Sequence, residues 1–500
     1  MDETLETGTT TGTRYETVIG LEVHAQVLTA SKMFCGCAAS YADSEPNSAT
    51  CPVCLGLPGA LPVMNMAAVR KVLLTGLALG CSIPQYNKQD RKSYFYPDLP
   101  KGYQISQYDL PLCVGGELRF ESDGEERQAG ITRVHMEEDT GRLLHRTTEL
   151  GQELSLVDLN RSGVPLMEIV GEPDLRSAHE ARDYLIALRQ ILRYIGASTG
   201  NMEEGAFRCD ANISVRRAGD TDFGEKVEIK NLNSFRAVQR ALEFETERQV
   251  AALESGQPMH QETRGWVEDR GITVGQRTKE HAHDYRYFPE PDLPPSRIDG
   301  AQIEAARAEL PELPAERRAR FHDAYGLSHA DAAQLAAERN VADAFEEAIG
   351  PNAAPARIKG AANWIINDLA GLSAQRGDAP DTVPITGSQL GEVLDLIETE
   401  AITVRGAKDL VPELRPGDSP RAEAERRSLL ALEDHGVVER AVADVMSAFP
   451  EAVADYRGGK KAAIGRLIGE TMKRTGGRAN PDTVRRTLEA TLNETVGTGS

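Results

Sequence analysis

The sequence predicts an α+β protein: a mixed α/β domain with a central sheet, then an all-helical domain, then a small helical tail domain. Strand-like runs alternate with helical stretches over residues 15–294, which predicts the mixed domain. A Pro-rich segment, EPDLPPSR (290–297), ends this pattern, and the chain after it is rich in Ala, Glu and Arg and has the pattern of helices. A second break, VPELRPGDS (411–419), predicts that the helical part divides into two domains.

Five strand-like runs define the mixed domain, several of them with an apolar alternation of period two: TVIGLEVHAQV, AGITRVHMEED, LSLVDLNR, RCDANISVRR and KVEIKNL. Helical patterns lie between them at residues 65–80, 178–195 and 235–253. Because charged residues recur at alternate positions of these runs, we expect a sheet with one face that is polar and functional.

The chain of 500 residues is expected to form two or three domains, because single hydrophobic cores stop growing at roughly 250–300 residues. We expect a disordered leader at 1–14, the mixed domain at 15–294, the helical domain at 295–410 and the tail domain at 411–495. The leader, MDETLETGTTTGTR, has no basic segment and no apolar core, so it does not have the pattern of a signal peptide. No apolar run reaches about 18 residues, so we expect no membrane span.

The composition is acidic, with 56 Lys and Arg against 77 Asp and Glu and a net charge of −21. Overall charge therefore does not indicate a nucleic-acid partner, which would need local basic patches. GDTDFGEK (219–226) lacks the spacing of a P-loop, and the chain has neither a GxGxxG turn before a helix nor a GxSxG elbow. Seven cysteines, four of them clustered, favour a reducing cytoplasm and a metal site over a disulfide framework.

The clustered cysteines form two close pairs, Cys35 with Cys37 and Cys51 with Cys54. This spacing is typical of a closed zinc cage of four thiolates, which is a structural site because it leaves no open position for a substrate. The alternative is a group of four buried free thiols. The isolated Cys81, Cys113 and Cys209 are expected to be ordinary buried residues.

Acidic residues recur at same-face spacing in four strand-like segments. Glu22 and His24 lie on the same face of their predicted strand, and so do Glu228 and Lys230 of theirs. In RCDANISVR, the residues that share a face are Asp210, Asn212 and Ser214. Three consecutive acidic residues end the fourth strand: Glu137, Glu138 and Asp139. Carboxylates gathered in this way hold Mg²⁺, usually beside nucleotide phosphates. A solvated strand face or a set of salt bridges is the alternative for any one of these residues.

Aromatic and basic residues are interleaved in two segments, KSYFYPDLPKGYQISQYD (92–109) and KEHAHDYRYFPEPDL (279–293). Such segments can stack on and neutralise the single-stranded end of a nucleic acid. The alternative is a small aromatic core beneath two loops, and composition alone does not decide between them.

The tail carries a local basic stretch in an otherwise acidic chain. Its members are Lys460, Lys461, Arg466, Lys473, Arg474 and Arg478. This stretch predicts a surface that binds RNA phosphates, and a solvated helix face is the alternative.

The motifs closely resemble those of the B subunit of the aspartyl/glutamyl-tRNA amidotransferases. The resemblance extends from about Tyr15 to past Pro481 and is carried by VIGLEVHAQ, KSYFYPDLPKGYQISQYD, HMEEDTGR, LVDLNRSGVPLMEIV, MEEGAFRCDANISVR, EIKNLNSF, DYRYFPEPDL and YRGGKKAAIGRLIGETMK. It implies an N-terminal catalytic cradle domain, a helical domain and a small tail domain, and the basic stretch of the tail is then expected to bind the body of tRNA.

The resemblance also implies the chemistry of a carbon–nitrogen ligase. ATP and Mg²⁺ convert the side-chain carboxylate of Asp or Glu, esterified to tRNA, into an acyl phosphate, and ammonia then displaces phosphate to give Asn-tRNA or Gln-tRNA. By motif, the catalytic residues that hold Mg²⁺ are Glu22, His24, Glu138, Asp210 and Glu228, with Glu138 favoured over Glu137. Lys101, Arg208 and Lys230 are implied to supply further positive charge toward ATP, and the four-cysteine zinc is implied to be structural.

The chain shows no glutaminase signature, so the resemblance implies a heterotrimer with an amidase-type A subunit that releases ammonia from glutamine and a small C subunit. The implied substrates are Asp-tRNA(Asn), Glu-tRNA(Gln) or both, in the cytoplasm, with no membrane and no DNA. Two alternatives remain at this point: a Mg²⁺-dependent kinase or ligase acting on a small molecule, and a zinc-bearing RNA-binding scaffold. ATP turnover that ignores aminoacyl-tRNA would favour the first, and tRNA binding without ATP turnover would favour the second.

Overall fold

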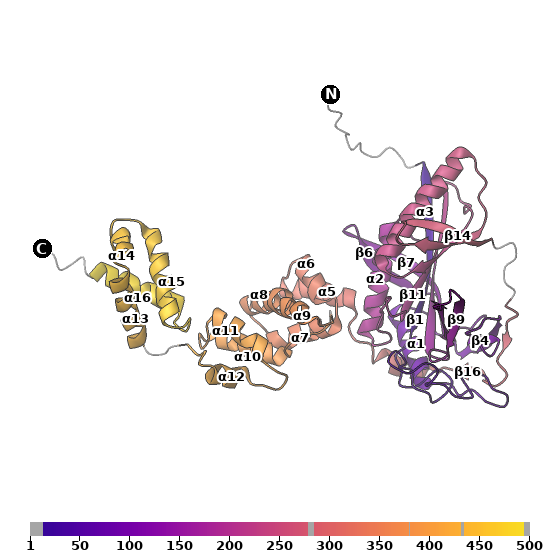
Figure 1. Ribbon diagram of the computed structural model, residues 1–500, viewed down its shortest axis with the longest axis horizontal. Coiled ribbons are helices and arrows are strands. Elements are labelled where there is room, and N and C mark those ends of the chain that lie inside the picture. The colour runs from indigo at the N-terminus through magenta and orange to yellow at the C-terminus, as the bar shows by residue number, and fades with distance from the viewer. Residues whose placement is uncertain (1–13, 279–284, 380, 432–434, 495–500) are drawn as a thin grey trace, which may run out of the picture. The chain divides into compact units, whose positions relative to one another are not determined.

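The computed structural model describes residues 14–278, 285–379, 381–431 and 435–494. Most of the predicted leader, residues 279–284 of the second aromatic segment and the last six residues lie outside this part. The chain divides into two compact units, Met1–Ala315 and Glu316–Ser500 (Figure 1). Each unit is described by itself.

The first unit contains all the strands of the described chain and four helices. The strands are β1 (Tyr15–Gln26), β2 (Tyr86–Asn87), β3 (Asp90–Ser93), β4 (Tyr103–Ser106), β5 (Cys113–Val114), β6 (Glu117–Ser122), β7 (Glu125–Glu138), β8 (Arg142–Thr147), β9 (Glu153–Asp158), β10 (Pro165–Gly171), β11 (Phe207–Arg217), β12 (Val227–Leu232), β13 (Glu262–Val267), β14 (Ile272–Thr278), β15 (Phe288–Pro289) and β16 (Ser296–Arg297). The helices are α1 (Met66–Ala78), α2 (Ala178–Tyr194), α3 (Phe235–Ser255) and α4 (Gly300–Arg307).

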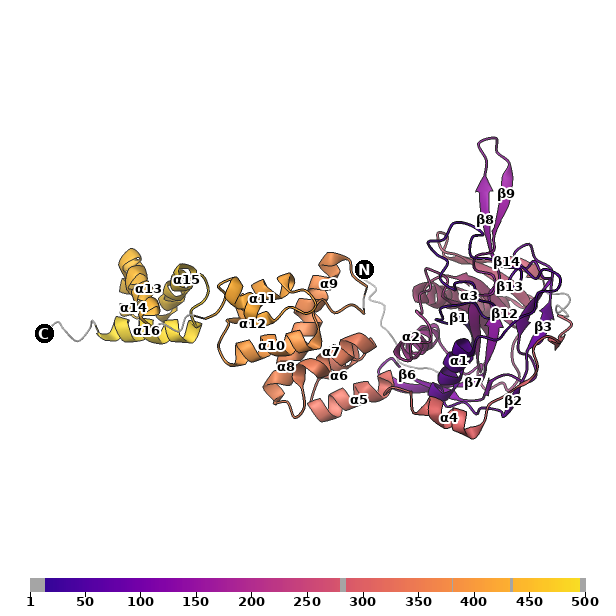
Figure 2. The ribbon, with the colours of Figure 1, turned by 90° about the horizontal axis from the view of Figure 1, so that it is seen from below.

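A mixed sheet of nine strands forms the centre of this unit. Its order is β14-β13-β12-β11-β1-β10-β7-β5, and β6 also pairs with β7. Neighbouring strands are antiparallel except for the parallel pair β12–β13. A small sheet of order β15-β3-β4 brings the two aromatic segments of the sequence together. The hairpin β8–β9 projects from the rest of the unit (Figure 2).

The alternation of β1 explains how the central sheet acquires two different faces. Leu21, Val23 and Ala25 are buried in the main hydrophobic core together with residues of α1, α2 and α3. The residues between them, Glu22 and His24, therefore point to the opposite face. The sheet thus has one apolar face in the core and one polar face, as the sequence pattern predicts.

The three predicted helices of the mixed domain are present, and their ends follow local rules. The Ser177 side chain accepts a hydrogen bond from the Glu180 N–H and begins α2. Gly256, at φ 68°, ends α3 in the left-handed conformation that glycine adopts without strain.

The second unit is helical and contains two separate hydrophobic cores. The first core is built from α5 (Pro314–Tyr325), α6 (His329–Leu335), α7 (Arg339–Ile349), α8 (Pro355–Asn363), a π-helix (Trp364–Leu369), α9 (Ala370–Arg376), α10 (Gly387–Glu398), α11 (Val404–Leu410), a 3₁₀ turn (Val411–Glu413) and α12 (Pro420–Arg426). The second is built from α13 (His435–Ala448), α14 (Pro450–Arg457), a 3₁₀ turn (Lys461–Ala463), α15 (Ile464–Arg474) and α16 (Pro481–Glu494). Within the described residues, no helix has the length and apolar character needed to cross a membrane.

The structural divisions differ in position from the boundaries predicted at 294 and 410. Helix α4 stays with the first unit because Ala306 is buried in its core and Arg70 forms an ion pair with Glu309. Val411, Leu414 and Ala424 are buried in the first core of the second unit, so the Pro- and Gly-rich segment at 411–419 is a turn within that core.

Candidate active site

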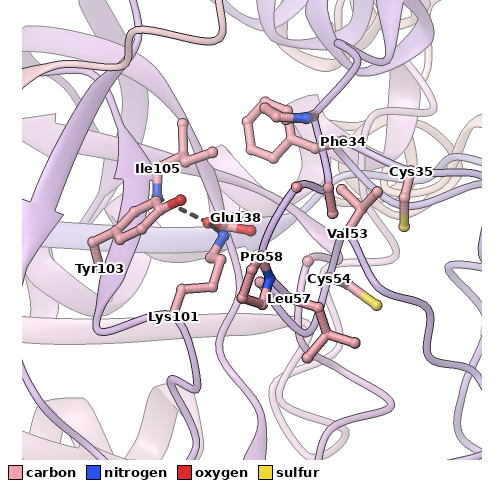
Figure 3. Close-up of a pocket in the computed structure, with 15 residues that line it drawn as sticks. Phe34, Cys35, Val53, Cys54, Leu57, Pro58, Lys101, Tyr103, Ile105 and Glu138 are labelled. Atoms are coloured by element: carbon pink, nitrogen blue, oxygen red, sulfur yellow. Dashed lines mark hydrogen bonds and ion pairs between the residues drawn. The ribbon is translucent and has the colours of Figure 1, made fainter.

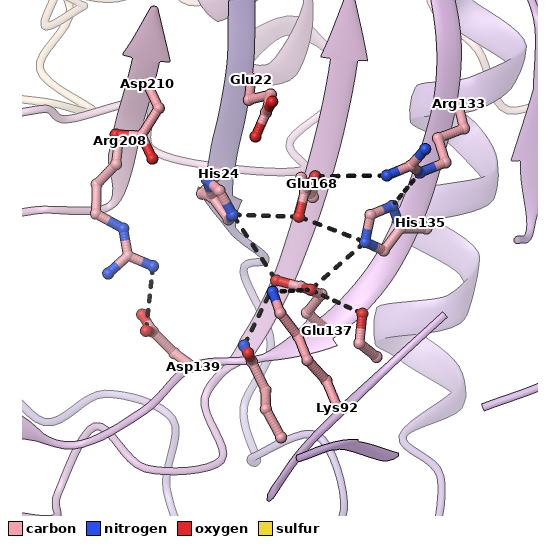
Figure 4. Close-up of polar contacts among 12 residues, drawn as sticks. Glu22, His24, Lys92, Arg133, His135, Glu137, Asp139, Glu168, Arg208 and Asp210 are labelled. Carbon is pink, nitrogen blue, oxygen red and sulfur yellow. Dashed lines mark hydrogen bonds and ion pairs between the residues drawn. The ribbon is translucent and has the colours of Figure 1, made fainter. Parts of the chain in front are cut away.

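Charged side chains from four neighbouring strands, β11, β1, β10 and β7, gather on the polar face of the central sheet (Figure 4). In the strand register, His24 of β1 lies opposite Glu168 of β10 and opposite Arg208 of β11, and Glu22 lies opposite Asp210. The face continues to His135 and Glu137 of β7 and to Glu228 of β12. Because directly opposed residues of paired strands point to the same face, the register itself brings these groups together.

The centre of this face is a cluster of His24, Glu137 and Glu168. One ligand atom from each lies within 4.8 Å of the other two. His24 Nε2 is 3.3 Å from Glu168 Oε2 and 3.8 Å from Glu137 Oε2. The Glu137 side chain is 2% exposed and that of Glu168 10%, so two carboxylates are held together away from solvent, where positive charge or a shared proton must offset their repulsion.

Three neighbouring groups offset the charge of this cluster. His135 Nε2 lies 3.5 Å from both carboxylates, Lys92 Nζ lies 4.0 Å from Glu137, and the Ser106 hydroxyl donates to Glu137 at 2.7 Å. Burial raises the pKa of Glu137, but Lys92 and His135 outweigh it and hold the pKa below its usual value. Burial lowers the pKa of His24, but Glu168 outweighs it and raises that pKa. Two carboxylates and an imidazole thus converge in a form suited to a divalent cation.

Glu168 is the member of this cluster that sequence reasoning missed. It lies in PLMEIVG, a short run that is buried on both faces and therefore shows no alternation. A single glutamate inside an apolar run was the available signal, because a buried carboxylate needs a specific partner.

The predicted residues Glu22, Asp210, Glu228 and Lys230 form a second group on the same face. Lys230 Nζ lies 2.6 Å from Asp210 and 3.1 Å from Glu228, and Asn212 donates to Glu22 at 3.0 Å. Burial lowers the pKa of Lys230, but Asp210 and Glu228 outweigh it and raise that pKa. Of the five ligands predicted for Mg²⁺, His24 alone belongs, within the described residues, to a group of three or more whose ligand atoms lie within 4.8 Å of one another.

Glu138 does not share this site, which differs from the choice of Glu138 over Glu137. Successive residues of a strand point to opposite faces, so Glu138 points away from His24 when Glu137 points toward it. Glu138 forms a buried ion pair with Lys101 and accepts a hydrogen bond from the Ile105 N–H at 2.9 Å. The predicted Lys101 therefore also lies away from the cluster. Both line a pocket beside the cysteine segment (Figure 3).

Asp139, directly after β7, fixes the position of Arg208 on the polar face. Its buried carboxylate accepts hydrogen bonds from Arg208 Nη2 at 3.1 Å and from Gln26 Nε2 at 2.9 Å. Burial raises the pKa of Asp139, but Arg208 and Arg161 outweigh it and lower that pKa. Arg208 is thereby held next to His24 as a fixed positive charge.

We expect Asp139→Asn to lower the free energy of unfolding of the first unit by about 2–4 kcal/mol, because Arg208 loses its charged acceptor. The folded-state pKa of Asp139 lies below the unfolded value of about 3.9, so the carboxylate stabilises the fold at higher pH and loses this effect as pH falls through the folded value. The free energy of unfolding, measured in urea, should therefore differ between Asp139→Asn and wild type by a constant amount from about pH 8 to pH 5. This difference should shrink below about pH 4. Asp43→Asn, at an exposed position, is the control. An unchanged unfolding midpoint in Asp139→Asn at pH 7 would contradict this role.

The four clustered cysteines also converge. One Sγ from each lies within 4.8 Å of the others, and all four are free of disulfides. Cys51 Sγ and Cys54 Sγ are 3.9 Å apart, close to the separation of about 3.8 Å that tetrahedral Zn²⁺ with Zn–S bonds of about 2.3 Å imposes. A hydrogen bond from Cys35 lowers the pKa of the Cys54 thiol to about 5 despite burial, and the Cys51 N–H and the Lys32 ammonium add to this effect.

The basic residues predicted to bind tRNA lie on α15 and its flanking turns. Five of them are exposed, and Arg478 is half-buried. Three face acidic neighbours: Lys460 with Asp455, Lys473 with Glu470, and Arg474 with Asp444. Lys461 and Arg466 instead stand over the rings of Tyr456 and Phe449, at 4.6 and 5.2 Å from the ring centroids.

Family models match both units of the chain. The model described as the GatB/GatE catalytic domain covers residues 17–304, and the model described as the GatB domain covers residues 343–492. Three relatives, each named as the B subunit of an aspartyl/glutamyl-tRNA(Asn/Gln) amidotransferase, align over 96% of this chain. They are those of Thermomicrobium roseum (55% identical, 99% of its length), Anaeromyxobacter dehalogenans (50%, 99%) and Moorella thermoacetica (50%, 100%).

The chain belongs to this B-subunit family. Membership confirms the resemblance drawn from the sequence motifs. It also favours an amidotransferase subunit over a stand-alone small-molecule kinase and over an RNA-binding scaffold, neither of which is among these relatives.

Proposed function

We propose that this B-subunit family member is the transamidating subunit of a tRNA-dependent amidotransferase, a carbon–nitrogen ligase. It would phosphorylate the side-chain carboxylate of Asp-tRNA(Asn), Glu-tRNA(Gln) or both with ATP, and ammonia would then give Asn-tRNA or Gln-tRNA. The observation that carries the proposal is the cluster of His24, Glu137 and Glu168 beside Lys92 and Arg208 on the polar sheet face.

The chemistry requires an arrangement of this kind. A carboxylate oxygen is a poor leaving group, and transfer of the γ-phosphoryl group makes it a good one. Ammonia then attacks the carbonyl carbon, the C–O bond to phosphate breaks, and the attacking nitrogen loses a proton. Both reactants of the first step are anionic, so Lys92 and Arg208 would lower their mutual repulsion and hold them in line.

The cluster fits Mg²⁺, which we propose as its ligand. His24, Glu137 and Glu168 would hold the ion, and Glu22, Asp210 and Glu228 would act beside it rather than as direct ligands. When bound, Mg²⁺ offsets negative charge on the transferring phosphoryl group. We further propose a Zn²⁺ ion held by Cys35, Cys37, Cys51 and Cys54. Its role would be structural, because four thiolates fill the tetrahedral coordination of Zn²⁺ and leave no position for a substrate.

In this proposal, a partner subunit produces the ammonia. An amidase-type A subunit would release ammonia from glutamine, a small C subunit would complete the heterotrimer, and the complex would act in the cytoplasm. The subunit designation of the relatives supports a multi-subunit enzyme.

Reconstitution tests the proposal. The chain, co-expressed with an amidase-type partner and a C subunit, should form Asn-tRNA or Gln-tRNA from mischarged tRNA, ATP and glutamine, and the reaction should stop when ATP is withheld. Amide formation that proceeds equally well without this chain would overturn it.

We also propose that the tail domain, residues 435–494, binds tRNA. Lys461→Gln with Arg466→Gln should weaken the binding of mischarged tRNA about threefold to tenfold and reduce the slope of log K against log salt by up to about 2, because two phosphate contacts are lost. Filter binding between about 50 and 200 mM salt measures both quantities. Arg421→Gln, an exposed arginine on α12, is the matched control. An unchanged salt slope in the double variant would exclude this surface.

A further inference from the structure

Two aromatic segments that lie far apart in the sequence meet in the first unit. Strand β3 pairs with β15, which places Tyr285 and Tyr287 beside the segment that carries Tyr94 and Tyr108. The rings of Tyr108 and Tyr287 are stacked, with centroids 4.3 Å apart and planes 8° apart. Tyr285 contacts Tyr287 and Tyr94 edge to face, at 6.1 and 6.0 Å.

The stacked pair differs from an ordinary aromatic core in its exposure. One face of the Tyr108 ring is covered by Tyr287, yet Tyr108 remains 58% exposed, so its other face is open to solvent. The backbone beneath the ring is fixed, because the buried carboxylate of Asp90 accepts a hydrogen bond from the Tyr108 N–H at 3.1 Å and is itself paired with Lys88. A ring with a fixed backbone and an open face is preorganised to stack on a planar ligand.

The aromatic group is connected to the cluster of His24, Glu137 and Glu168. Lys92 Nζ lies 5.1 Å from the centroid of the Tyr285 ring and 4.0 Å from Glu137. Tyr285 contacts Tyr287, and Tyr287 stacks on Tyr108, so a continuous series of contacts leads from Lys92 to Tyr108.

We propose that the open face of Tyr108, supported by Tyr287, stacks on the adenine ring of a substrate whose reacting group lies at the His24–Glu137–Glu168 cluster. This inference rests on the proposed function. Both substrates of that reaction carry an adenine: ATP itself, and the 3′-terminal adenosine to which the amino acid is esterified. Base–aromatic stacking contributes about 1–3 kcal/mol per base and needs no other recognition of the base.

The test compares Tyr108→Ala and Tyr108→Leu with Tyr108→Phe in the reconstituted complex. The first two remove the aromatic face, whereas Phe keeps it and loses only the hydroxyl. We expect Ala and Leu to raise the KM for ATP or for mischarged tRNA by about 5- to 100-fold, and Phe to stay within about twofold of wild type. Phe223→Ala, an exposed aromatic on the β11–β12 connection, should change neither KM.

Binding of tRNA that lacks its terminal adenosine identifies the source of the adenine. If the adenine belongs to tRNA, this truncation should weaken binding to wild type and leave binding to Tyr108→Ala unchanged. If it belongs to ATP, the Kd of ATP should rise in Tyr108→Ala, and the truncation should affect both proteins equally. Unchanged KM values in both Ala and Leu, or a Phe variant as impaired as Ala, would overturn the inference. A wild-type complex that forms no amide would instead refute the proposed function.

Discussion

Glu137→Gln is expected to lower ATP-dependent transamidation by about two to three orders of magnitude. The substitution keeps the size of the side chain but removes one of the two carboxylates that converge with His24, and losing one preorganised electrostatic contact has this effect in other enzymes. Glu168→Gln removes the other carboxylate and should have a similar effect. Single-turnover formation of the amide on mischarged tRNA measures the loss.

Two controls separate chemistry from folding in this experiment. Glutamine hydrolysis by the partner subunit should keep its basal rate, because its active site lies on another chain. Glu16→Gln changes the same residue type at the far end of β1, where Glu16 pairs with Arg176 and Arg216, and should leave the rate within about twofold. Near-normal transamidation by folded Glu137→Gln would mean that this cluster is not the kinase site.

Cys54→Ser is expected to remove zinc from the protein and to lower the melting temperature of the first unit by at least about 10 °C. Structural zinc contributes about 10–16 kcal/mol of apparent binding energy in small domains, and one lost ligand forfeits much of it. The cysteine segment also supports its surroundings. The Ala49 N–H donates to Asn160 at 2.8 Å and the Ser162 hydroxyl donates to the Cys54 carbonyl at 3.2 Å, just before strand β10, which carries Glu168.

Metal analysis measures the loss of zinc in Cys54→Ser, and calorimetry measures the fall in its melting temperature. Cys209→Ala removes a buried thiol outside the cluster and should leave the zinc content unchanged while costing roughly 1 kcal/mol. Wild-type protein that contains no zinc, and whose four thiols react freely in the native state, would contradict the assignment.

Several strands of the first unit could be predicted from the sequence because apolar and polar residues alternate along them. Residues 21–26 of β1 alternate between apolar and polar, which makes the two faces of the sheet predictable there, and the patterns at 178–195 and 235–253 become α2 and α3. LSLVDLNR also forms a strand, β9, but it pairs only with β8 in a projecting hairpin. Alternation predicts that a run is a strand and does not say which sheet it joins.

The choice between Glu137 and Glu138 illustrates the same limit. Alternation requires that the two point to opposite faces, but which one meets His24 depends on the register of β7 with β10 and of β10 with β1. A shift of one residue in either pairing would exchange them. The partners of Glu168 and Asp139 could not be predicted for a related reason, since they come from strands far away in the chain.

The transfer of one oxygen atom tests the central claim most directly. The side-chain carboxylate of the amino acid on mischarged tRNA is labelled with ¹⁸O, and the inorganic phosphate released by the reconstituted complex is analysed by mass spectrometry. Phosphorylation of the carboxylate predicts one ¹⁸O atom in each released phosphate, with the amount of labelled phosphate formed per unit time lowered by about two to three orders of magnitude when Glu137→Gln replaces wild type. Amide formation accompanied by phosphate that contains no ¹⁸O would contradict the account, because the carboxylate oxygen would then not have been the acceptor of the phosphoryl group.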